Sequence, residues 1–166
     1  MSIEQYKFKP KLPNLDQAKV FHDKLERGDG WEICKYYCDV NATFQSQASV
    51  CQPPVAAEPD LGGSLENFAE WMKMSATQLM PDCYFTDRIS TYDEDSKTAI
   101  ISLVFHGKHT KTPEGAPLPP PTNKSIACDC VYKIHFNNMG KIDHVVKIWN
   151  FEWAAKELGW LNLTYT

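Results

Sequence analysis

Three glycine-containing segments recur in the last third of this 166-residue chain: Gly107-Lys108-His109-Thr110, Gly140-Lys141-Ile142-Asp143-His144 and Leu158-Gly159-Trp160. Between them apolar and polar residues alternate, which is typical of β-strands with one buried face. The pattern predicts a strand ending in a histidine, a stiff flap with five prolines at residues 112–122, and a hairpin that closes at a glycine. We expect strands near residues 83–92, 97–109, 125–136 and 141–151.

The first half of the chain predicts helices. Apolar residues recur at three- and four-residue steps after Asn14, and Gly28 and Gly30 end that run. A short second helix is expected from Trp31 to about residue 39, followed by a strand at residues 42–47, and a third helix from Ser64 to Pro81. With a helical turn at residues 152–158, this order predicts an α+β fold.

Length and charge limit the possible functions. The chain fits one domain, for which we expect residues 14–166 to form the domain and residues 1–13 an N-terminal arm. A formal net charge of -4 gives no basic stripe for nucleic acid. Without a long apolar run, we expect a soluble, cytoplasmic protein that is not in a membrane. Six cysteines are interpreted as reduced thiols rather than as a metal site.

Several motifs give this order a resemblance to the NTF2-like superfamily, within it to the SnoaL-like (polyketide cyclase-like) branch. The resemblance covers residues 14–160. The motifs that carry it are Tyr37-Cys38-Asp39-Val40-Asn41-Ala42-Thr43-Phe44, Pro81-Asp82, Gly107-Lys108-His109-Thr110, Pro121-Thr122, Gly140-Lys141-Ile142, Trp149-Asn150 and Leu158-Gly159.

The resemblance implies a cone in which helices pack on a strongly curved antiparallel sheet and enclose an apolar cavity. It implies a homodimer formed through the sheet, a small apolar molecule as ligand, and no cofactor or metal. A polar group in such a cavity has a shifted pKa, so the cavity suits small-molecule chemistry. The same scaffold also serves binding or dimerisation without catalysis.

Three residues are candidates for catalysis. His109 matches the cavity histidine of SnoaL-like cyclases, where an imidazole could polarise a carbonyl or move a proton. The family's carboxylate base has no certain counterpart, because Tyr132 stands at its position while Asp129 lies three residues earlier with opposite strand parity. Even-numbered residues of the strand near 125–136 are apolar, so Asp129 is also readable as a surface charge.

Five further residues are candidates for ligand binding. Asn150 stands where the family usually has an aspartate, and an amide there could orient a ligand without acting as a base. The aromatic candidates are Trp149, Tyr37, Phe44 and Trp71, each of which is also readable as core packing. By contrast, Lys147, His144 and Arg88 are interpreted as solvated charges on the sheet.

Two functional hypotheses follow. The first is a cofactor-independent enzyme, an isomerase, cyclase or lyase, that catalyses proton transfer, cyclisation, isomerisation or dehydration of an apolar carbonyl compound. In it His109 polarises, Tyr132 or Asp129 accepts a proton, and Asn150 orients the ligand. The second is a non-catalytic binding or dimerisation module, favoured by the missing carboxylates. A cavity filled by side chains would support the second, and a pocket with a perturbed acid or base would count against it.

Overall fold

A computed structural model describes residues 13–46 and 63–161 of the chain. The expected N-terminal arm therefore lies, except for Pro13, outside the described residues. The described helices are α1 (Asn14–Glu26), α2 (Trp31–Cys34), α3 (Leu65–Met74) and α4 (Phe151–Glu157), and the described strands are β1 (Cys38–Ser46), β2 (Tyr84–Asp93), β3 (Thr98–Lys108), β4 (Ser125–Phe136) and β5 (Ile142–Ile148).

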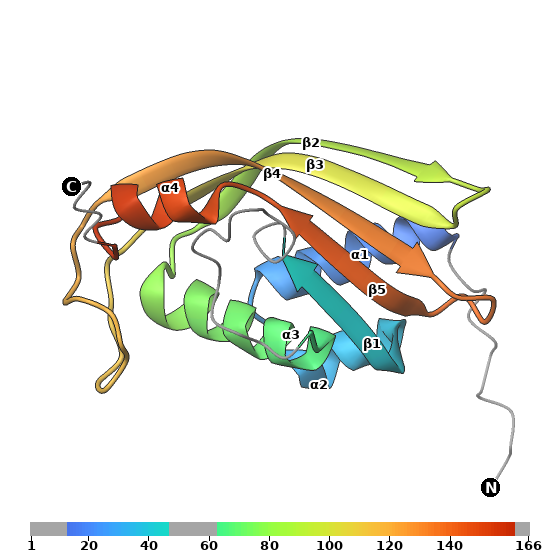
Figure 1. Ribbon diagram of the computed structural model, residues 1–166, viewed down its shortest axis with the longest axis horizontal. Helices are drawn as coiled ribbons and strands as arrows, with labels where there is room; N and C mark the ends of the chain where they lie inside the picture. The colour runs from blue at the N-terminus through green and yellow to red at the C-terminus, as the bar shows by residue number, and fades with distance from the viewer. Residues whose placement is uncertain (1–12, 47–62, 162–166) are drawn as a thin grey trace, which may run out of the picture.

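The strands form one curved sheet that covers the helices (Figure 1). Its order is β1-β5-β4-β3-β2, and α1 and α3 lie on its concave side, while α4 follows β5 at one end. The expected α+β arrangement of helices on a curved sheet is confirmed. The sheet is mixed, however, because β1 enters at the edge and runs parallel to β5, whereas the other neighbouring pairs are antiparallel as expected.

Strand β4 carries the alternation that the sequence predicted. Its even-numbered side chains from Ile126 to Phe136 face the helices and are buried, except for the half-buried Cys128. The odd-numbered side chains face outward. Fully buried residues of β3 and β4, including Ile101, Tyr132, Ile134 and Phe136, form the centre of the core with Phe21 and Phe68 of the helices.

The helices begin and end close to the expected residues. The Ser64 hydroxyl accepts a hydrogen bond from the backbone N–H of Asn67 and caps α3. The last turn of α3 widens into a π-helical turn, Ser75–Leu79, just before Pro81. The second helix is shorter than expected, since it tightens into a 3₁₀ turn at residues 35–37 and β1 begins at Cys38 rather than near residue 42.

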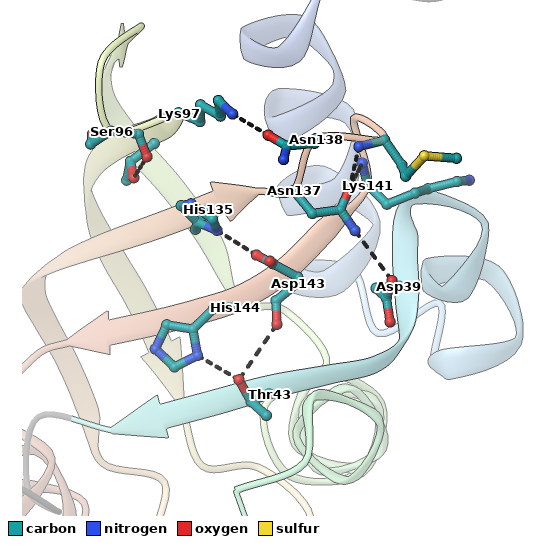
Figure 2. Close-up of polar contacts among 12 residues, drawn as sticks. Asp39, Thr43, Ser96, Lys97, His135, Asn137, Asn138, Lys141, Asp143 and His144 are labelled. Carbon is teal, nitrogen blue, oxygen red and sulfur yellow. Dashed lines mark hydrogen bonds and ion pairs between the residues drawn. The ribbon is translucent and has the colours of Figure 1, made fainter.

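Polar contacts on the outer face of the β4–β5 hairpin join side chains of the hairpin to each other and to side chains of β1 (Figure 2). The Asn137 amide donates to Asp39, and the His144 ring lies 2.6 Å from the hydroxyl of Thr43 on β1. His135 contacts Asp143 at 2.5 Å between Nδ1 and Oδ1. The pairing of β4 with β5 has a one-residue bulge at Asp143, because Phe136 pairs with Ile142 but His135 pairs with His144.

The cysteines within the described ranges are all free thiols. Cys34, Cys38 and Cys130 are buried, while Cys83 and Cys128 are half-buried. Cys51 lies outside those ranges. No group of three or more His, Cys, Asp or Glu in the described ranges could hold a metal ion. Among the helices of these ranges, none is long and apolar enough to cross a membrane.

Candidate functional site

A cavity lies between the concave face of the sheet and the end of α3. Its wall is mostly aromatic and aliphatic, with three tryptophans, Trp71, Trp149 and Trp160. Two ionisable side chains of opposite charge type, Glu26 and Lys147, also reach it. The space that water can occupy is about 30 Å³, which is room for roughly two water molecules. The cavity is therefore small and apolar, with an acid and a base in its wall.

Glu26 is a buried carboxyl at the end of α1. Ala18, His22 and Glu26 are four residues apart, so they share the helix face that packs under the sheet. The Tyr132 hydroxyl of β4 donates a hydrogen bond to Glu26 Oε1. Burial raises the pKa of Glu26, although Lys147 and this hydrogen bond partly oppose the shift. A carboxyl of this kind can exchange a proton closer to neutral pH than a surface glutamate can.

Lys147 is a buried lysine surrounded by aromatic rings. Its side chain is 6% exposed, and its ammonium nitrogen lies 4.2 Å from the ring centre of Trp149, with Phe68 and Tyr132 at 5.6 and 5.7 Å. These are cation–π distances. The interpretation of Lys147 as a solvated charge is wrong, because the bulge at Asp143 shifts the pairing so that Lys147 stands opposite the inward-facing Tyr132.

His22 completes this buried polar cluster. Its ring lies edge-on to the rings of Tyr132 and Phe85, and its Nε2 is 3.6 Å from Glu26 Oε1. Burial, together with the positive charges of Arg88 and Lys147, lowers the pKa of His22 to about 3. Because this lowered pKa keeps His22 neutral, the His22–Glu26 contact is not an ion pair near neutral pH.

Two polar groups in this region have no hydrogen-bond partner among the described residues. They are the indole N–H of Trp160, in the cavity wall, and both ring nitrogens of His22. A buried polar group without a partner is costly and uncommon in folded proteins. Both groups are therefore available to a bound molecule.

His109 is not part of the cavity wall. It lies at the junction between β3 and the proline-containing loop at residues 112–122. Its Nδ1 accepts from the backbone N–H of Thr122 at 3.2 Å, and its Nε2–H donates to the Thr112 hydroxyl at 2.8 Å. The Thr112 hydroxyl in turn donates to the carbonyl of Pro119. Burial lowers the pKa of His109. Both ring nitrogens thus hold the loop, and the ring packs edge-on to Trp160.

The structure separates the other predicted site residues into three groups. Trp149 and Trp71 line the cavity, and Tyr132 donates a hydrogen bond to Glu26, the carboxyl in the cavity wall. Phe44, stacked on Phe68 at 3.7 Å between ring centres, and Tyr37 pack with the core. Asp129 is exposed on the outer face of β4, and Asn150 is exposed and caps α4 by accepting from the backbone N–H of Trp153.

Sequence reasoning missed Glu26 as a site residue. The one available signal was its four-residue spacing from Ala18 and His22, which places it on the buried face of α1. That signal is weak, because a glutamate in the last turn of a helix is usually exposed. For Lys147 the sequence gives no comparable signal, since its direction depends on a bulge at a residue that has no distinctive side chain.

Comparisons by sequence find no relatives: no family model and no curated protein matches the chain. Comparisons by structure do. A provisionally assigned polyketide cyclase from Xanthomonas campestris pv. campestris aligns with a TM-score of 0.61 at 16% identity, over 88% of this chain and 99% of that chain. A provisionally assigned isomerase from Bacillus subtilis aligns with a TM-score of 0.59 at 18% identity, over 92% and 100%.

A third similar structure is a phenazine biosynthesis-related protein from Pseudomonas aeruginosa, with a TM-score of 0.58 at 12% identity over 92% of each chain. An epoxide hydrolase/cyclase-like enzyme that acts in pyran ring formation aligns at 0.56 and 14% identity over 82% of this chain and 90% of that chain. At such identities the likeness concerns the arrangement of helices and strands, and it extends over nearly the whole length of each partner.

Proposed function

From the premise that the chain has the NTF2-like fold in its SnoaL-like form, we propose that it is a cofactor-independent enzyme acting on a small carbonyl compound. The reaction class is proton transfer next to a carbonyl, which underlies isomerisation, cyclisation and dehydration alike. The observation that supports this most is a buried carboxyl with a raised pKa, Glu26, in the same apolar cavity as the ammonium of Lys147.

Each group has a chemical role in the proposed reaction. Glu26 removes a proton from the carbon next to the carbonyl and returns it at a second position. Lys147 faces the oxygen on which negative charge develops, and the apolar wall strengthens that attraction because few waters screen it. Tyr132 orients Glu26 through its hydroxyl, and the Trp160 indole N–H is a second donor for the substrate oxygen.

His109 has a positioning role in this proposal rather than a catalytic one. It fixes the loop at residues 112–122, and its ring supports Trp160 in the cavity wall. The proposal from sequence therefore keeps its reaction class but changes two roles: Glu26 replaces Tyr132 or Asp129 as the proton acceptor, and Lys147 replaces His109 as the group that polarises the carbonyl.

The second candidate is a non-catalytic binding module. Its support is the size of the cavity, since about 30 Å³ of water-accessible space is far below the few hundred cubic ångströms of a typical ligand pocket. In this alternative, ligands bind after side-chain movement, and the Glu26–Tyr132–Lys147 cluster only shapes the cavity.

Hydrogen–deuterium exchange separates the two candidates. Small aryl and alkyl β-diketones and β-keto esters are incubated with the protein in D₂O, and loss of the α-proton is followed by NMR. The expected result is exchange above the buffer rate for at least one compound, with Glu26→Gln lowering the rate about 10²- to 10⁴-fold and Lys147→Met about 10²-fold.

The matched controls are Asp129→Asn and Lys133→Met, which alter the exposed face of β4. Both should exchange at the rate of the unmodified protein. If every compound exchanges at the buffer rate while some of them bind, the enzymatic proposal fails and the binding module stands. Equal exchange by the protein and by Glu26→Gln would remove Glu26 from the reaction.

A further inference from the structure

A second hollow opens on the surface between α1 and β2. It has a volume of about 710 Å³ and is lined by both polar and aromatic side chains. Its wall includes His22, Glu26, Cys83, Phe85 and Arg88. We call this hollow the α1–β2 groove. Unlike the inner cavity, it has space for a whole small molecule.

The groove and the cavity share part of their walls. Glu26, Ala76, Cys83 and Phe85 line both of them. These four side chains are thus the partition between an open outer space and a small inner one. Glu26 can therefore be approached from either side, and a ligand seated in the groove would reach it without passing through the cavity.

His22 is a buried polar side chain in the groove wall whose unpaired ring nitrogens indicate a ligand. Its side chain is 2% exposed and lies in the groove wall, and neither ring nitrogen has a hydrogen-bond partner among the described residues. A neutral imidazole has one N–H donor and one acceptor nitrogen. A hydroxyl or carbonyl group of a ligand would satisfy one of them and remove part of the cost of burying them unpaired.

The charged residues around the groove are already paired with one another. Arg88 of β2 contacts the carboxylate of Asp23 on α1, and Arg27 contacts Asp29 at 2.9 Å. Arg88 reaches α1 because β2 is bulged between Thr86 and Ile89, where Asp87 adopts a φ of 56° that is uncommon outside glycine. With these pairs formed, the groove offers hydrogen bonds more than net charge.

Resting on the function proposed above, we propose that the α1–β2 groove is the outer chamber of the site, and that His22 binds the hydroxyl or carbonyl of a neutral ligand there. The ligand is a small aryl or alkyl carbonyl compound carrying a hydroxyl group. Its polar end lies at the ring of His22, on the groove side of Glu26, and its apolar body lies along Phe85 and Tyr84.

The test uses three probes of one shape: para-hydroxyacetophenone, para-methylacetophenone and the anion para-acetylbenzoate. Binding to the unmodified protein is followed by NMR of the ring nitrogens of its five histidines, with His22 assigned from His22→Phe. The expected result is that the hydroxyl probe shifts the His22 nitrogens and binds about fivefold more tightly than the methyl probe, as one added hydrogen bond predicts.

In His22→Phe the ring contacts with Tyr132 and Phe85 are retained but the nitrogens are lost. The hydroxyl probe should then bind no better than the methyl probe, whose own affinity should stay unchanged. The matched control is His144→Phe, on the outer face of β5, which should keep the preference for the hydroxyl probe. The comparison of hydroxyl- and methyl-probe affinities on the unmodified protein does not depend on the folding of either variant.

Three outcomes would overturn the proposal: unmoved His22 nitrogens on saturation with the hydroxyl probe, equal affinities of the hydroxyl and methyl probes, or tightest binding of the anion. The result is independent of catalysis. If His22 binds the hydroxyl probe but no compound exchanges deuterium, the proposed binding site in the groove is supported and the proposed enzymatic function is rejected. If Glu26-dependent exchange occurs while His22→Phe binds all probes with unchanged affinity, the enzymatic function is supported and the proposed binding site in the groove is rejected.

Discussion

The two faces of the β4–β5 hairpin place similar residue types in opposite environments. On the inner face, Tyr132 pairs with Lys147, and both side chains are almost wholly buried beside Glu26. On the outer face, His135 pairs with His144, and His135 meets Asp143 with side-chain exposures of 42% and 34%. The two residue pairs are only three positions apart along β4.

The difference shows that position in the sheet, rather than residue type, decides what an ionisable group can do. Inside, water is largely absent, so a carboxyl and an ammonium influence each other strongly and their protonation can serve chemistry. Outside, solvent screens the same kind of contact, and an exposed ion pair contributes about 0 to 1 kcal/mol. The following predictions test this contrast, from the largest effect to the smallest.

Tyr132→Ala should have the largest effect. It removes a fully buried ring and leaves Glu26 without its hydroxyl donor, so the free energy of unfolding should fall by about 3–5 kcal/mol. Urea denaturation measures this loss. Lys133→Ala, the next residue on the outer face, should change the same quantity by less than about 0.5 kcal/mol. Similar losses in the two variants would contradict the contrast between the faces.

The pH dependence of stability should reveal the buried His22. Its pKa is about 3 in the folded protein and about 6.5 in the unfolded chain, so the unfolded chain binds the extra proton as the pH falls below about 6.5. Stability from a neutral His22 is therefore present above that pH and is lost on acidification, by up to about 1.4 kcal/mol per pH unit.

Glu26 acts in the opposite direction, because its raised folded-state pKa makes the folded protein gain stability as the pH falls toward its ordinary value. His109 has a lowered pKa and the same sign as His22. Both groups remain in His22→Phe, so comparing this variant with the unmodified protein isolates His22. The unfolding midpoints of the two proteins in urea should therefore diverge at pH values below neutral, and curves that stay parallel would contradict a neutral, buried His22.

The outer contacts should give the smallest effect. Replacing Asp143 by asparagine removes the charge that faces His135, and we expect a loss below about 1 kcal/mol that shrinks further at high salt. Urea denaturation at low and high ionic strength tests this. A loss of several kcal/mol would mean that the outer cluster in Figure 2 stabilises the fold as much as the buried one does.

The fold could be predicted largely from the sequence because it follows from local patterns. Alternation in residues 125–136, the Gly140 hairpin and the Ser64 cap each depend on a few neighbouring residues, and each is found in the structure. The direction of β1 could not be obtained in this way. It depends on which strand β1 meets after the chain has folded, and no residue of β1 itself encodes a parallel partner.

The site was harder to predict, because its residues come together from distant parts of the chain. His109 matched a motif, yet its neighbours Thr112 and Thr122 use both of its nitrogens to hold a loop. Glu26 and Lys147 lie on α1 and β5, and neither has a motif. Trp71 was found because it lies on the apolar side of the third predicted helix, and Trp149 because it belongs to the Trp149-Asn150 motif; both line the cavity.

The bulge at Asp143 has a consequence for comparing this chain with distant relatives. Because the extra residue there turns Lys147 inward, a relative with a hairpin of the same length but no bulge would present the residue before its lysine to the interior. An alignment without a gap in this hairpin would then equate an interior position with an exterior one. The bulge is thus part of the information that specifies the site, and it should be located before residue identities are compared.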